Sequence, residues 1–151
     1  DCSAGKRQMT DIGLIVARVM IAVMFIASGY GALMDLSGAS AYFGGLGLPV
    51  PLLVAVATGF FEIAAGAFLV AGFQTRIVAV VLAAFCLFAT YVGHYGQGGD
   101  AASAFTHQQM LLKDIAVAGG LILVALFGAG VLSVDAWFAR RAKVPPIAEN
   151  G

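Results

Sequence analysis

Two charged side chains stand inside long apolar runs, and their types suggest a buried ion pair. Arg18 is the only charge in residues 12–34, and Glu62 is the only charge in residues 36–75. Counted along their helices from Asp11 and from Gly72, which we expect on the same side of the membrane, Arg18 lies roughly 10 Å and Glu62 roughly 15 Å deep. Because a lone charge in lipid costs at least about 2.5–3.5 kcal/mol, we expect the two to pair across antiparallel helices. The spacing leaves open whether such a pair only stabilises the protein or also lines a functional cavity.

A second group of polar residues falls near the opposite ends of these runs. Its members can hydrogen-bond or titrate: Tyr30, His94, Lys113 and Asp114. One interpretation is a binding site for a polar headgroup such as a quinone carbonyl. The other is interfacial capping, in which Asp114 favours a helix N-terminus and Lys113 extends toward lipid headgroups.

Metal or haem ligation has little support in the sequence. His94 and His107 flank one loop, but neither a third ligand motif nor a Cys-x-x-Cys pair accompanies them. Cys2 lies in a polar segment and Cys86 in an apolar run, so we expect no disulfide and interpret Cys86 as a packing residue. We therefore expect no metal site, no catalytic residue and no intrinsic cofactor.

Transmembrane helices are the elements that would position these side chains. Of 151 residues, 61% are hydrophobic and 11% are charged, with a mean hydropathy of +0.97, which is too apolar for a soluble domain. Eight Lys and Arg balance eight Asp and Glu, so the chain has no basic field for nucleic acid. Four apolar runs are long enough to cross a bilayer core of about 30 Å: 11–33, 51–72, 76–95 and 108–133.

The basic residues predict the topology. Loops 34–50 and 96–107 contain no Lys or Arg, so by the positive-inside rule both termini face the cytoplasm. The prediction is an all-α integral membrane antiparallel four-helix bundle. It comprises a polar N-terminal tail at 1–10, a transmembrane domain at 11–135 and a polar C-terminal tail at 136–151. The basic residues that support this topology are Lys6, Arg7, Arg76, Arg140, Arg141 and Lys143.

Four segments together resemble the DoxX family. They read "ARVMIAVMFIASGYGAL", "YFGGLGLPVP", "GFFEIAAGAFLVAGFQTR" and "LLKDIAVAGGLIL", and the resemblance covers residues 12–125. The family often has a lysine shortly after the Ser-Gly pair, where this chain has Ala32, so any role of that lysine is in doubt here. The residues that carry the resemblance, in order, are Arg18, Ser28, Gly29, Glu62, Thr75, Arg76, Lys113 and Asp114.

The resemblance implies a small multi-pass protein of the bacterial cytoplasmic (inner) membrane, associated with quinone-coupled redox systems such as thiosulfate:quinone oxidoreductase. Our leading hypothesis is an accessory or anchor subunit of a quinone-linked respiratory or redox complex, in contact with membrane lipid and other subunits. It would contribute to a quinone site without being an autonomous enzyme. The alternative is a small proton-linked transporter or carrier in which Glu62 changes protonation. Four helices would form such a pathway as a homo-oligomer.

Overall fold

The computed structural model describes residues 2–142, which form six helices. Four of these, α1, α3, α4 and α5, contain segments long and apolar enough to cross a membrane. The predicted all-α, four-span architecture is confirmed, whereas the side on which the termini lie stays a prediction. The helix bounds are α1 Cys2–Met34, α2 Leu36–Gly45, α3 Pro51–Ala71, α4 Thr75–His94, α5 Ala101–Phe127 and α6 Val134–Arg141.

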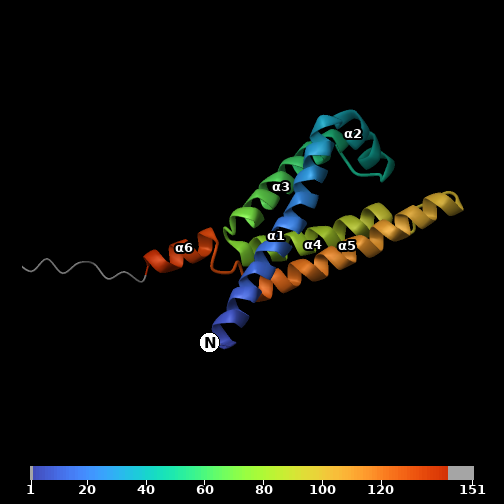
Figure 1. Ribbon diagram of the computed structural model, residues 1–151. Coiled ribbons are helices and arrows are strands. Elements are labelled where there is room, and N and C mark those ends of the chain that lie inside the picture. The colour runs from blue at the N-terminus through green and yellow to red at the C-terminus, as the bar shows by residue number, and fades with distance from the viewer. Residues whose placement is uncertain (1, 143–151) are drawn as a thin grey trace, which may run out of the picture.

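The four long helices form two pairs. Figure 1 shows α1 alongside α3 and α4 alongside α5, with the pairs converging near α6 and diverging toward α2. The apolar core lies where the pairs converge and contains many small residues, which permit close helix approach in lipid. In the half of the molecule toward α2, where the pairs diverge, a cavity lies between them. Core members include Ala22, Phe25, Ala65, Leu69, Ala79, Leu82, Cys86, Ala118, Leu121 and Val124.

Glycines set the register of α1 against α3. A Cβ atom added to Gly29 would lie 2.5 Å from the carbonyl oxygen of Gly59 and 3.0 Å from the Cβ atom of Glu62. A Cβ atom added to Gly66 would lie 3.1 Å from the carbonyl oxygen of Ala22. Such close backbone contact is possible only where no side chain intervenes. Glu62 is therefore held opposite the stretch of α1 that contains Gly29.

Arg18 is buried against the end of α3, with 2% of its surface exposed. Its Nε donates to the carbonyl oxygen of Leu69 at 3.1 Å and its Nη2 to that of Val70 at 2.9 Å. Its Nη1 donates to the carbonyl oxygen of Ala129, in the α5–α6 connection. The last carbonyls of a helix lack intrahelical donors, and lipid supplies none. The guanidinium satisfies them and complements the negative end of the α3 dipole.

The expected Arg18–Glu62 ion pair is not formed. Arg18 is opposite Val70, whereas Glu62 lies opposite Gly29, eleven residues or roughly 16 Å further along α1. Ser28 hydrogen-bonds the Glu62 carboxyl instead. The ion pairs within 4.0 Å among residues 2–142 lie elsewhere. Two buried charges at similar counted depth are thus satisfied separately, one by carbonyl groups and one by a hydroxyl.

Helix α6 begins within the expected transmembrane domain and occupies part of the expected C-terminal tail. Its Asp135 binds the turn between α3 and α4. The Asp135 carboxylate accepts hydrogen bonds from the backbone N–H of Gln74 at 2.7 Å and of Thr75 at 2.9 Å. Its own N–H donates to the carbonyl oxygen of Gly72 at 2.9 Å. A carboxylate at this position caps the start of α4 and complements its dipole.

We expect Asp135→Ala to lower the free energy of unfolding by about 1–2 kcal/mol, because it removes the cap from α4. Thermal unfolding in detergent measures the loss. Asp135→Asn keeps one acceptor oxygen and should lose less. An alanine variant as stable as the wild type would show that this cap contributes nothing.

Three segments differ from the sequence-based expectations. Helix α2 lies in the expected loop 34–50, where the side chain of Asp35 caps it by accepting from the N–H of Gly38 at 2.9 Å. Helix α1 extends back to Cys2 through the expected N-terminal tail, and α5 begins at Ala101 rather than at 108. Residues 143–151 of the expected C-terminal tail lie outside the described part.

Candidate functional site

A cavity of about 500 Å³ lies between the diverging helix pairs. Side chains from α1 to α5 line it, and most are apolar, including Phe25, Phe43, Phe85 and Phe88. A cavity of this size with apolar walls and a few polar groups is typical of small-ligand sites. The polar and thiol-bearing residues that line it are Ser28, Tyr42, Thr58, Glu62, Cys86, His94, Lys113 and Asp114.

Three of the four polar residues predicted to form a layer do meet at this cavity: His94, Lys113 and Asp114. Tyr30 does not line it and is 59% exposed. The reason is helical geometry, because Tyr30 follows Ser28 by two residues and so points to nearly the opposite side of α1. Depth along the chain was estimated from the sequence, but the direction of the side chain was not.

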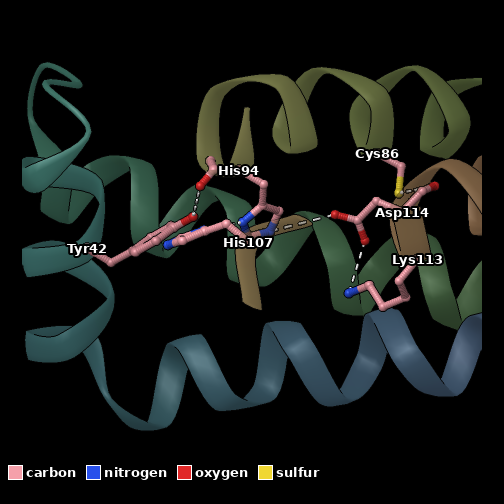
Figure 2. Close-up of polar contacts among 7 residues, drawn as sticks. Tyr42, Cys86, His94, His107, Lys113 and Asp114 are labelled. Atoms are coloured by element: carbon pink, nitrogen blue, oxygen red, sulfur yellow. Dashed lines mark hydrogen bonds and ion pairs between the residues drawn. The ribbon is translucent and has the colours of Figure 1, made fainter. Parts of the chain in front are cut away.

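The polar end of the cavity is a chain of interactions between α4 and α5 (Figure 2). Lys113 Nζ lies 3.0 Å from Asp114 Oδ1, and Asp114 Oδ2 lies 3.8 Å from His94 Nε2. On the other side of the same ring, His94 Nδ1 lies 3.1 Å from His107 Nδ1. His94 ends α4, whereas the other three residues lie on α5. The chain of interactions therefore links the end of α4 to the first half of α5.

Tyr42 on α2 was missed by the sequence analysis because its segment was expected to be a loop. Its hydroxyl donates to the carbonyl oxygen of Gly93 at 3.4 Å, which brings α2 onto α4 (Figure 2). Burial raises the pKa of Tyr42, and the negative charge of Asp114 raises it further. The Tyr42 hydroxyl therefore stays protonated at neutral pH and remains a hydrogen-bond donor. Asp35 before a helix-length segment was the sequence signal for α2.

A second acidic group faces the cavity from α3. Glu62 is 8% exposed, and Ser28 is its hydrogen-bonding neighbour. Cys86 on α4 also lines the cavity, and its thiol donates to the backbone carbonyl oxygen of Asp114 at 3.5 Å. Ala32, the position at which the resemblance to the DoxX family led us to expect a lysine, also lines the cavity. The departure from the family pattern thus falls within the site, where Lys113 supplies an ammonium group.

Comparison with known proteins identifies the family. The DoxX family model matches residues 13–95, which include most of α1 and all of α2, α3 and α4. The inner membrane protein YphA of Escherichia coli (strain K12) is 32% identical over 124 residues, or 81% of this chain and 87% of YphA. The inner membrane protein YqjF of the same strain is 28% identical over 134 residues, or 85% of this chain and 94% of YqjF. No solved structure matches the chain. This chain therefore belongs to the DoxX family and is a multi-pass inner-membrane protein.

Proposed function

We propose that this protein is an accessory or anchor subunit of a quinone-linked respiratory or redox complex, and that its cavity binds the quinone headgroup. The observation that carries the proposal is the cavity itself, which has mostly apolar walls and a cluster of polar groups formed by His94, Lys113 and Asp114. Quinones dissolve in the bilayer, so a site between transmembrane helices is accessible to them. The membrane location and the DoxX family membership are consistent with this role.

The residues present fit a quinone. A quinone headgroup is a planar ring with carbonyl oxygens that accept hydrogen bonds, so its site needs donors and apolar surface. His94 and Lys113 supply donors at the cavity, and the Tyr42 hydroxyl would supply one by turning from the carbonyl oxygen of Gly93. Phe25 and Phe85 supply aromatic surface. A bound quinone would supply the redox chemistry, while this chain's residues would bind and orient the headgroup. Electron donors would then come from a partner subunit.

The two tyrosines provide a matched test of the ligand site. Tyr42→Phe removes one hydroxyl from the cavity wall, whereas Tyr30→Phe removes one from the exposed face of α1. We expect Tyr42→Phe to weaken binding of decylubiquinone by up to about tenfold, the value of one hydrogen bond, and Tyr30→Phe to leave it unchanged. Titration of the purified protein in detergent measures both dissociation constants. Equal binding by both variants and the wild type would contradict the assigned site.

The subunit role has its own test. Purification of the full chain from its native membrane in a mild detergent, followed by mass spectrometry, should recover a stoichiometric redox partner and retained quinone. A clean single-chain preparation that turns over substrate would replace the subunit role with an autonomous enzyme. Recovery of bound lipid but no quinone would contradict the proposal that the cavity binds quinone.

A proton-linked carrier is the second candidate, and one observation favours it. Glu62 faces the cavity from a nearly buried position beside Ser28, with no Lys or Arg within 4.0 Å among residues 2–142. An intramembrane carboxylate without a counter-charge is typical of proton relays. Proton-coupled uptake into proteoliposomes that is lost in Glu62→Gln would favour the carrier over the subunit.

A further inference from the structure

The two histidines of the chain form a pair at the outer edge of the cavity. His94 Nδ1 and His107 Nδ1 are 3.1 Å apart, a hydrogen-bonding distance between two ring nitrogens (Figure 2). Such a bond needs one nitrogen with a proton and one without. If both were bare, two lone pairs would face each other, and if both carried protons, two N–H groups would collide. Each ring's tautomer therefore depends on the other's.

The far side of the His94 ring favours one tautomer. Its Nε2 faces the Asp114 carboxylate at 3.8 Å, and the Lys113 ammonium binds that carboxylate at 3.0 Å. An ionised carboxylate only accepts hydrogen bonds, so the ring favours Nε2–H on this side, directly or through a water molecule. In a neutral ring this leaves Nδ1 of His94 bare, and it must accept from His107.

We infer that His107 is a positioning residue for the cavity: its Nδ1–H holds His94 in the Nε2–H tautomer, which directs a donor into the ligand site. The tautomer of one ring nitrogen is commonly set by the hydrogen bond that the other makes. His107 does not itself line the cavity, so its contribution acts through His94. The inference extends the proposed function, because it identifies what keeps one of the quinone donors in its donating form.

The assignment also locates the one ring nitrogen that is left to take up a proton. In the neutral pair, Nε2 of His107 is bare, and protonation there allows the Nδ1 proton to shift to His94. The added charge then faces Asp114, although the added proton itself stays on His107. The other titratable or charged groups that line the cavity are Lys113 and Asp114 on α5, Tyr42 on α2, Glu62 on α3 and Cys86 on α4.

The test exploits the presence of only two histidines in 151 residues. In the full chain labelled with ¹⁵N-histidine, NMR at alkaline pH should show one ring as Nε2–H and the other as Nδ1–H, with coupling between their Nδ1 nuclei. In His107→Gln the side-chain amide still donates, so the His94 ring should remain Nε2–H. In His107→Leu no donor remains, and a mixture of tautomers should appear. A wild-type His94 with its proton on Nδ1 would overturn the inference, whether or not the variants fold.

A binding measurement separates positioning from a merely structural role and rests on the proposed function. At alkaline pH, His107→Leu should bind decylubiquinone up to about tenfold more weakly than the wild type, and His107→Gln should restore the affinity. Equal weakening in both variants would overturn the positioning role. Failure of the wild type to bind at all would overturn the proposed function and leave the tautomer result intact.

Discussion

Arg18→Gln should lower the free energy of unfolding by at least about 3 kcal/mol. The substitution removes the guanidinium from three carbonyl oxygens: that of Leu69 keeps the N–H of Gly72 at 3.3 Å, whereas those of Val70 and Ala129 lose their donors. Each buried polar group left without a partner costs about 1–3 kcal/mol. In a membrane the loss is not repaired by water. Thermal or denaturant unfolding in detergent, together with the folded yield, measures the effect.

Two variants show what Arg18 contributes. Arg18→Lys keeps the positive charge but lacks the planar set of five donors, so it should recover only part of the stability. Glu62→Gln should cost little, because Glu62 is not the counter-charge of Arg18. A double-mutant cycle should then be additive within about 0.5 kcal/mol. A coupling energy well above this value would show that Arg18 and Glu62 interact, contrary to the structure.

Gly29→Leu should be comparably destabilising, because this side chain would be placed against the backbone of α3. Even its Cβ atom would lie 2.5 Å from the carbonyl oxygen of Gly59. Overpacking of this kind costs about 1–3 kcal/mol and often more where backbone must move. Separation of α1 from α3 would also displace Glu62 from Ser28. We expect a lower unfolding temperature and weaker ligand binding in the same variant.

Gly31→Leu is the matched control for this substitution. It lies two residues along the same helix, and a Cβ atom there meets nothing within 4 Å. The control should fold as well as the wild type, because its side chain would enter lipid. Equal damage by both substitutions would mean that Gly29 matters for some property other than close packing.

The four spans could be predicted from the sequence because hydropathy, the property that defines them, can be summed along the chain. Long stretches without charge, interrupted only by Arg18 and Glu62, are enough to mark helices that lipid can cover. Helix α2 could not be found in this way, since ten residues are too few to span a membrane. Helix α6 was hidden for a related reason, because its charged residues were interpreted as a polar tail.

The site was only partly predictable, because side-chain direction and helix register are not contained in residue counts. His94, Lys113 and Asp114 were grouped correctly by depth, but Tyr30 at a similar depth points away from the cavity. Arg18 and Glu62 were paired by depth as well. Their actual partners depend on how α1 slides along α3, which the contact at Gly29 determines.

The attachment of the α5–α6 segment to the α3–α4 turn has a consequence for how the protein is made. The carbonyl oxygen of Ala129 accepts from Arg18, and Asp135 caps α4, so both ends of that turn depend on residues translated after the last span. During synthesis, the first three spans enter the membrane while the cap of α4 is still missing. Stable closure of the bundle therefore waits until the chain has emerged from the ribosome beyond Asp135.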